Sequence, residues 1–152
     1  MNGAESTASP ILRMEGGSKR YGGVRALADA NLANEQIGYI NAHGTATPGN
    51  DPAESAAIRE VFGPQADRFG VSSTKSMHGH ALGAAGSIEA VVTIMSLHDG
   101  ILPPTANFTK ADPACDLDYI PNAPRKSRPE AALSNSFAFG GLNAVLAFRA
   151  AP

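Results

Sequence analysis

The sequence predicts an α/β domain in which helices cover a layered, mixed β-sheet, and two patterns support this fold class. Residues 37–42 and 69–74 are short β-prone runs, each followed by a Gly/His loop and then a helical stretch, as in a parallel sheet. Residues 132–137 and 143–148 are further β-prone runs on either side of a glycine-rich turn, which is typical of an antiparallel pair. We therefore expect a sheet that contains both kinds of pairing.

The first β-prone run, residues 37–42, stops at His43. A helix is expected after the following turn, with Asp51 as its N-cap, Pro52 at its first position and Gly63 at its end. The strand then carries His43 at its C-terminal end. Ligands of open α/β sheets bind outside such strand ends, so His43 is a candidate site residue.

After the second run, a loop that contains Lys75 and His80 leads into an apolar helix, predicted at residues 82–97. Glu89 is the only charged residue of this helix. The stretch is short, rich in Gly, Ala and Ser, and charged in its middle, which argues against a membrane span. We expect a helix that is buried inside the protein.

The remaining segments carry weaker patterns. A short amphipathic helix is expected at residues 24–32 and a brief strand at residues 117–120. Residues 1–23 are polar, rich in Gly and Ser and without sustained periodicity, which predicts a poorly ordered leader. The folded domain is expected at residues 24–152.

Composition and charge narrow the class of protein. The 152 residues are 43% hydrophobic and 17% charged, as in one globular domain. The formal net charge of −2 gives no electrostatic reason to expect nucleic acid or anionic lipid as a partner. Cys115 is the only cysteine and no secretory leader opens the sequence, so we expect no internal disulfide and a cytoplasmic location.

Three clusters of polar and glycine residues follow the predicted strands. They are His43-Gly-Thr-Ala-Thr47, Lys75-Ser-Met-His-Gly-His80 with Gly83-Ala-Ala-Gly86, and Asn135-Ser-Phe-Ala-Phe-Gly-Gly141. Taken singly, each has a structural explanation, such as a hydrogen-bonded histidine or a glycine that supplies a turn. His78 and His80 have no Cys, Asp or Glu at a recognisable ligand spacing, so no metal site is predicted.

In this order, the three clusters resemble the motifs of the elongating β-ketoacyl-acyl-carrier-protein synthases and the related polyketide ketosynthases. The resemblance spans residues 24–150, with further support at residues 37–42, 103–107 and 115–119. It implies the C-terminal, thiolase-like half of such an enzyme. It also implies acyltransferase activity, the decarboxylative condensation of malonyl-acyl carrier protein with an acyl thioester in fatty-acid or polyketide synthesis.

The resemblance assigns five catalytic residues. His43 and His80 match the histidines that hydrogen-bond the malonyl thioester oxygen, where fixed donors stabilise the developing enolate. Lys75 and Glu89 match a pair that organises the histidine loop. A buried salt-bridge partner without a direct role is an equal alternative for Glu89. Phe139 matches the gating phenylalanine whose backbone N–H belongs to the oxyanion hole.

Thr45 and Thr47 resemble the hydroxyls that bind the phosphopantetheine arm of the substrate's acyl carrier protein. The implied partner is therefore acyl carrier protein, and no cofactor beyond its phosphopantetheine is implied. Two positions depart from the common motif: Ala138 stands where glycine is usual and Leu142 where threonine is usual. These departures predict a stiffer gating loop with a more apolar far side.

The cysteine nucleophile of the family lies in an N-terminal half that the sequence before residue 24 does not supply. Cys115 matches a position that is not nucleophilic in the family and is predicted to be a structural thiol. Three hypotheses follow: a synthase half that lacks the nucleophile, an inactive module that binds acyl carrier protein or malonyl thioesters, and a truncated remnant. The uncovered apolar helix predicts a homodimer or a separate N-terminal half as a partner.

The opening residues carry a different resemblance. Residues 10–27 resemble the start of an ABC-transporter ATPase, in which Tyr21 would stack on adenine. No glycine-rich phosphate loop follows, so ATP binding is not implied. A gene fusion near residues 25–29 is our hypothesis for this segment.

Overall fold

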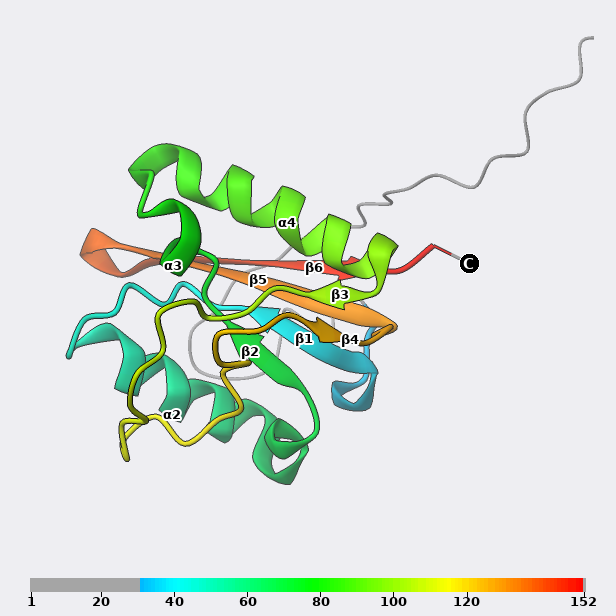
Figure 1. Cartoon of the computed structure of the whole chain (residues 1–152), viewed down its shortest axis with the longest axis horizontal. Helices are drawn as coiled ribbons and strands as arrows, with labels where there is room; N and C mark the ends of the chain where they lie inside the picture. Colours follow the sequence, from blue (N-terminus) through cyan, green and yellow to red (C-terminus); the bar gives the residue numbers. More distant parts are fainter. Residues whose placement is uncertain (1–30, 152) are drawn as a thin grey trace, which may run out of the picture.

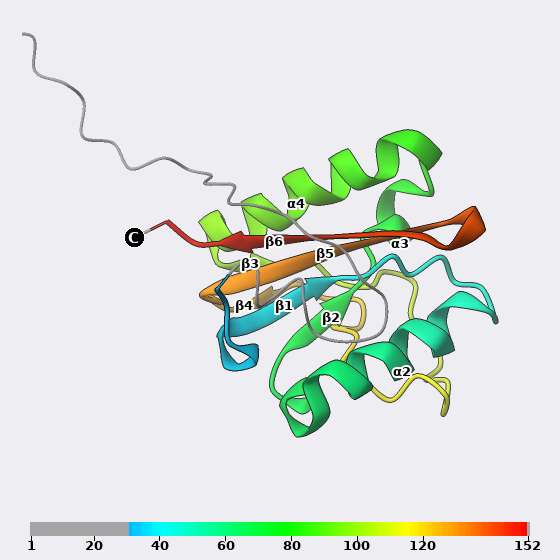
Figure 2. The ribbon, with the colours of Figure 1, turned by 180° about the vertical axis from the view of Figure 1, so that it is seen from behind.

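The computed structural model describes residues 31–151. The predicted leader at residues 1–23, the resemblance at residues 10–27 and nearly all of the helix predicted at residues 24–32 lie outside the described residues. In the described part, helix α2 (Asn50–Phe62) and helix α4 (Ala85–Asp99) lie on opposite faces of a four-stranded sheet (Figure 1; Figure 2).

The sheet is mixed, which confirms the predicted fold class. Its strands are β1 (Ile37–Asn41), β2 (Gly70–Ser72), β5 (Ala131–Ala138) and β6 (Leu142–Arg149), in the order β2-β1-β5-β6. Strand β1 pairs in parallel with both β2 and β5, and β5 pairs antiparallel with β6. The near-continuous apolar sequence of β1 follows from its interior place, because helices cover both of its faces.

Helix α2 begins earlier than the sequence predicted. Its N-cap is Gly49 and its first residue is Asn50, so the assignments of Asp51 as the N-cap and of Pro52 as the first helical residue are wrong. The reason is the preceding turn: the backbone N–H groups of Asn50 and Asp51 both donate to the carbonyl of Thr47. The helix ends at Phe62 and continues as the 3-10 turn η2 (Gly63–Asp67). Another 3-10 turn, η1 (Asn34–Gln36), precedes β1.

The second strand-to-helix connection is more structured than expected. It contains a one-turn helix, α3 (Lys75–His78), and a 3-10 turn, η3 (Leu82–Ala84), before α4 begins. Helix α4 packs against β5. The α4 face that meets the sheet carries Glu89, Thr93 and Ser96, all buried. Exposed apolar side chains stand on its other side within the described residues, as expected for an apolar helix that this part of the chain covers on one face only.

The brief strand predicted at residues 117–120 is absent from the described structure. Ile120 has a φ of +48°, and its backbone N–H donates to the side chain of Asp118, which breaks any regular ladder. A two-stranded sheet forms instead between β3 (Ile101–Leu102) and β4 (Arg125–Lys126). The turn after β5 is the 3-10 turn η4 (Phe139–Gly141), as the predicted terminal pair requires.

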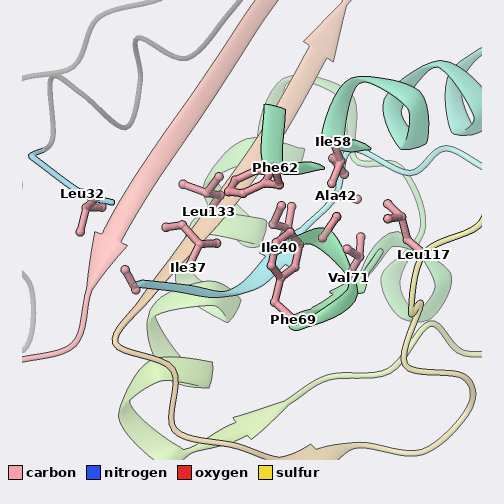
Figure 3. Packing of buried hydrophobic residues seen from close by; sticks show 12 residues of the cluster. Leu32, Ile37, Ile40, Ala42, Ile58, Phe62, Phe69, Val71, Leu117 and Leu133 are labelled. Atoms are coloured by element: carbon pink, nitrogen blue, oxygen red, sulfur yellow. The ribbon is translucent and has the colours of Figure 1, made fainter. Parts of the chain in front are cut away.

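Two apolar clusters hold the layers together. The larger cluster lies between the sheet and α2 and includes Ile40, Ile58, Phe62 and Val71 (Figure 3). The smaller cluster lies on the α4 side and joins Tyr39 of β1 to the end of α4. None of the helices in residues 31–151 has both the length and the apolar character needed to cross a membrane.

Candidate functional site

The end of β1 holds His43 through its backbone. The N–H of His43 donates to Glu54 Oε1 (3.0 Å), and that of Gly44 donates to Glu54 Oε2 (2.9 Å). Lys75 Nζ donates to the carbonyl of His43 (2.6 Å), and Ser73 Oγ donates to that of Gly44 (2.7 Å). Side chains therefore satisfy all four backbone polar groups of His43 and Gly44, and these bonds fix the backbone position from which the His43 side chain extends.

Gly44 is required by two features of this turn. Its φ is +38°, which lies in the left-handed region that favours glycine. A Cβ at this position would lie 2.4 Å from Ser73 Cβ, which no real side chain tolerates. The glycine after His43 thus lets the β1 end and the loop after β2 approach each other, and this approach brings Lys75 under His43.

Lys75 and Glu89 form a buried ion pair beneath the histidines. Their side chains are 5% and 0% exposed. Desolvation by burial raises the pKa of Glu89, and the hydrogen bond and charge of Lys75 oppose this shift. Among residues 31–151, Glu89 Oε2 has no hydrogen-bond partner. The pairing predicted for Lys75 and Glu89 is present in the structure.

Both histidines have a nitrogen that is held as an acceptor. Lys75 Nζ lies 3.4 Å from His43 Nδ1, and an ammonium group can only donate. The backbone N–H of Leu82 donates to His80 Nδ1 (3.2 Å). In each neutral ring the proton then sits on Nε2. The two rings lie edge to face with centroids 5.5 Å apart, so the arrangement offers two neighbouring N–H donors.

The neutral form of His43 is favoured by its surroundings. Burial first, and then the positive charges of Lys75 and His80, lower its pKa to about 4, while Asp51 has a small opposing effect. His43 is therefore uncharged at neutral pH and can serve as a hydrogen-bond donor through one nitrogen only.

This shift predicts a dependence of stability on pH. Between pH 4 and 6.5 the unfolded chain binds more protons at His43 than the folded chain does, so the free energy of unfolding falls as pH decreases through this window. The raised pKa of Glu89 acts in the opposite direction. Urea unfolding at pH 7 and pH 4.5 should show a smaller loss for His43→Gln than for the wild type. An equal loss would contradict the assignment, because Glu89 is unchanged in both proteins.

Thr45 and Thr47 line a cavity of about 720 Å³ next to the histidines. Their hydroxyls are 2.9 Å apart. Lys75 and His80 also line this cavity, whose opposite wall comes from the loop after β3. The wall residues include Asn107, Phe108, Lys110, Cys115 and Tyr119. The cavity thus joins two of the predicted catalytic residues to both predicted substrate-binding residues.

The structure does not bring Phe139 into the same cluster. This side chain is fully exposed at the tip of the β5–β6 hairpin. Ala138, just before it, has φ −134° and ψ 162°, an extended conformation that alanine adopts without strain. Two glycines with positive φ, Gly140 and Gly141, follow. Leu142 is exposed as well, so the hairpin tip presents an apolar surface.

Sequence reasoning missed two polar residues of the site, Glu54 and Asn41, and assigned no role to Asn135. Glu54 binds the histidine turn, as described above, and also accepts a hydrogen bond from Asn135 Nδ2 (3.0 Å). Asn41 Nδ2 donates to the carbonyl of Glu89 and to Thr93 Oγ1 (both 3.3 Å), which ties β1 to α4. A weak signal was available for Asn41, because an amide in the apolar run of a buried strand needs a partner.

Cys115 lies in the loop after β3, where its backbone N–H donates to the carbonyl of Asp112 (2.9 Å). Within the part of the chain that the structure describes, no three His, Cys, Asp or Glu side chains gather in a way that could hold a metal ion.

Comparison with known proteins assigns this arrangement to a family. Residues 4–109 match the family model described as "Beta-ketoacyl synthase, C-terminal domain". This chain belongs to the β-ketoacyl synthase family. The resemblance that we drew from the three sequence clusters is thereby confirmed, whereas the boundary between residues 23 and 24 and the roles of individual residues stay predictions.

Among curated relatives, nodulation protein E of Rhizobium leguminosarum bv. trifolii is 54% identical over 123 residues, which are 81% of this chain and 30% of that protein. The 3-oxoacyl-[acyl-carrier-protein] synthase 2 of Coxiella burnetii is 50% identical over 121 residues, 80% of this chain and 29% of that enzyme. This β-ketoacyl synthase chain therefore spans about 30% of the length of the curated relatives that it matches.

A solved structure shows the same fold. It contains a ketosynthase of a type II polyketide system, bound to a hexaketide and in complex with its acyl-carrier protein. The alignment has a TM-score of 0.80 and 42% sequence identity, and covers 82% of this chain and 31% of that chain. This β-ketoacyl synthase domain thus shares its layered arrangement of sheet and helices with the matching part of that ketosynthase.

Proposed function

We propose that this domain provides the decarboxylating half of a β-ketoacyl synthase site, in which His43 and His80 stabilise the enolate formed from malonyl-acyl carrier protein. The observation that carries the proposal is the pair of neighbouring imidazoles whose Nδ1 atoms both accept hydrogen bonds. Both Nε2–H groups can then donate to one oxyanion. Lys75 and Glu89 act through His43, by holding its backbone and its tautomer.

The proposed reaction begins with loss of carbon dioxide from the malonyl thioester. The electron pair of the broken C–C bond moves into the thioester, and negative charge develops on its oxygen, where the two histidines donate. The resulting carbanion attacks an acyl group held as a thioester on a cysteine, and that cysteine leaves as a thiolate. We propose that an N-terminal half, which these 152 residues do not include, supplies this cysteine.

We further propose that the cavity next to the histidines takes the phosphopantetheine arm of acyl carrier protein. Thr45 and Thr47 would bind the arm, and Phe139 would move at the hairpin tip to admit the acyl chain and present its backbone N–H. The solved ketosynthase in complex with its acyl-carrier protein supports this partner. The proposed place of action is the cytoplasm, where an unpaired thiol such as Cys115 stays reduced.

A second candidate function is a module that binds acyl carrier protein without turnover. The observation that favours it is the place of Cys115, the only cysteine, in a loop and away from any strand-to-helix turn. Carbon dioxide release from malonyl-acyl carrier protein distinguishes the candidates. Release above the level of carrier protein alone supports the enzyme, and binding without release supports the module. Neither binding nor release would contradict both, and an acylated Cys115 in mass spectrometry would contradict its structural role.

The outer face of α4 is the proposed contact for a partner. Ile88, Val91 and Met95 follow one another at helical spacing on this face, and 37%, 59% and 46% of their surfaces are exposed. His80, in the loop between α3 and η3, is also exposed in residues 31–151. A covering partner would thus bury apolar surface and also exclude water from the histidines. We propose a second copy of the chain as this partner when the N-terminal half is absent.

This proposal predicts self-association. Light scattering should give a dimer or a larger species at micromolar concentration, and Val91→Glu should shift it to the monomer. A two-fold contact would place the introduced charges close to each other, and the exposed position of Val91 leaves the monomer's core intact. Ala53→Glu, on exposed surface of α2, is the matched control. A dispersed wild-type monomer with no binding of a hydrophobic dye would contradict the proposal.

A further inference from the structure

We propose that Asn122 is a positioning residue that fixes the cavity wall formed by the loop after β3. Its side chain makes a reciprocal pair of hydrogen bonds with the backbone of Phe108. The N–H of Phe108 donates to Asn122 Oδ1 (2.8 Å), and Asn122 Nδ2 donates to the carbonyl of Phe108 (2.7 Å). Phe108 lines the cavity, whereas Asn122 does not. Asn122 therefore acts on the cavity through Phe108.

The pair holds a stretch of wall, residues 108–115, that has few other attachments. This stretch contains no buried residue. Five of its members line the cavity: Phe108, Thr109, Lys110, Asp112 and Cys115. Within residues 31–151, the two bonds to Asn122 are the only hydrogen bonds that join the stretch to another part of the chain. Because core packing is absent here, the position of the wall depends on Asn122.

The segments on either side of this stretch are held more firmly. Before it, the N–H of Ala106 donates to Ser76 Oγ in helix α3 (2.8 Å). After it, Leu117 and Ile120 are buried members of the two apolar clusters. Loss of the Asn122 side chain should therefore release the middle of the loop while both of its ends stay in place.

Position 122 makes two demands that asparagine meets together. The side chain pairs with both the N–H and the carbonyl of one residue, and an amide can accept and donate, whereas a carboxylate only accepts. The backbone has a φ of +59°, in the left-handed region that asparagine and glycine adopt most readily. Glycine would keep this backbone conformation and lose both side-chain bonds. Asn122→Gly thus separates the role of the amide from that of the backbone.

This inference rests on the proposed function, because the wall affects a substrate only if the cavity takes the phosphopantetheine arm. For Asn122→Gly we expect the KM for malonyl-acyl carrier protein to rise by about threefold or more, with kcat for carbon dioxide release changed by less than about twofold. A loosened wall weakens binding of the arm equally before and during the reaction. The donors stay in place, because Lys75 and the N–H of Leu82 hold the two histidines.

The closing experiment uses Cys115, the only cysteine, as a reporter of the wall in the full chain. Iodoacetamide should label Cys115 about threefold faster or more in Asn122→Gly than in the wild type, and pantetheine should protect it only at a higher concentration. Asn31→Gly is the matched control, because Asn31 is exposed, does not line the cavity and has a φ of +51°. It should be labelled and protected as the wild type is.

Equal labelling rates in the wild type and Asn122→Gly would overturn the inference, and so would an equal increase in Asn31→Gly. A fall in kcat without a rise in KM would also overturn it, because the change would then lie at the histidines. A wild type that pantetheine does not protect, or that releases no carbon dioxide, would instead count against the proposed function. The labelling rates would still decide the role of Asn122.

A second variant keeps the test decisive if Asn122→Gly unfolds, as measured by circular dichroism. Asn122→Asp retains the acceptor for the N–H of Phe108 and loses the donor to its carbonyl. It should therefore label Cys115 faster than the wild type while it stays folded. A wild-type labelling rate in folded Asn122→Asp would overturn the reciprocal pair as the device that holds the wall.

Discussion

Replacing His43 or His80 with alanine is expected to lower carbon dioxide release from malonyl-acyl carrier protein by about tenfold or more. Each replacement removes one N–H donor from the proposed enolate oxygen, and loss of one such donor costs about 3–4 kcal/mol of transition-state stabilisation in a dry site. The reduction should be smaller where the site stays open to water, as it does around His80 in residues 31–151. Release is measured with malonyl-acyl carrier protein labelled at the free carboxyl.

His98→Ala is the matched control, because His98 is an exposed histidine at the other end of α4. It should retain full release. Full release by both His43→Ala and His80→Ala would remove the proposed role of the paired donors. A loss in His43→Ala alone would assign the oxyanion contact to one histidine and leave His80 with a structural role.

Lys75→Met should be strongly destabilising, with a loss of about 3–5 kcal/mol in the free energy of unfolding. It would leave the fully buried Glu89 without a counter-charge, and Glu89 Oε2 already has no hydrogen-bond partner among residues 31–151. It would also remove the donor to the His43 carbonyl. Urea unfolding followed by circular dichroism measures the loss.

The double variant Lys75→Met/Glu89→Leu separates the two causes. An apolar pair of similar volume removes the unpaired charge, so much of the lost stability should return. Carbon dioxide release should stay low, because the double variant still lacks the group that holds His43. Stability that does not return would show that the lysine contributes mainly through the His43 carbonyl, and normal release would contradict the positioning of His43 by Lys75.

The strand ends could be predicted from the sequence because the signal is local. The apolar run before His43 and the glycine after it are enough to place the histidine at a strand end, and Gly44 proves necessary there through its positive φ. The two terminal runs and the glycines between them predicted the β5–β6 pair for the same reason. In each case the residues that decide the structure are within a few positions of one another.

The residues that the sequence did not reveal depend on distant contacts. Glu54 looks like an ordinary acidic residue in the first turns of a helix, and only its contacts with the His43 turn and with Asn135, 81 positions later, make it part of the site. The sequence also did not indicate which face of α4 packs against the sheet. Apolar residues occur all round this helix, so no periodicity indicated that Glu89 and Thr93 would point inward while Val91 pointed outward.

The pairing of β1 with β5 has a consequence for how the chain reaches its native state. Ile37 lies beside Ala131 in this parallel pair, so the centre of the sheet closes only after nearly the whole described chain has been made. Parallel contacts between such distant segments form slowly, because a long loop must be ordered before the contact stabilises it. Helix α4 needs only local contacts and can form first, with its apolar outer residues in water. Folding of this domain is therefore expected to be slow, and its yield is expected to fall as protein concentration rises, because the exposed apolar surface promotes aggregation. A partner present during synthesis would raise the yield of native protein.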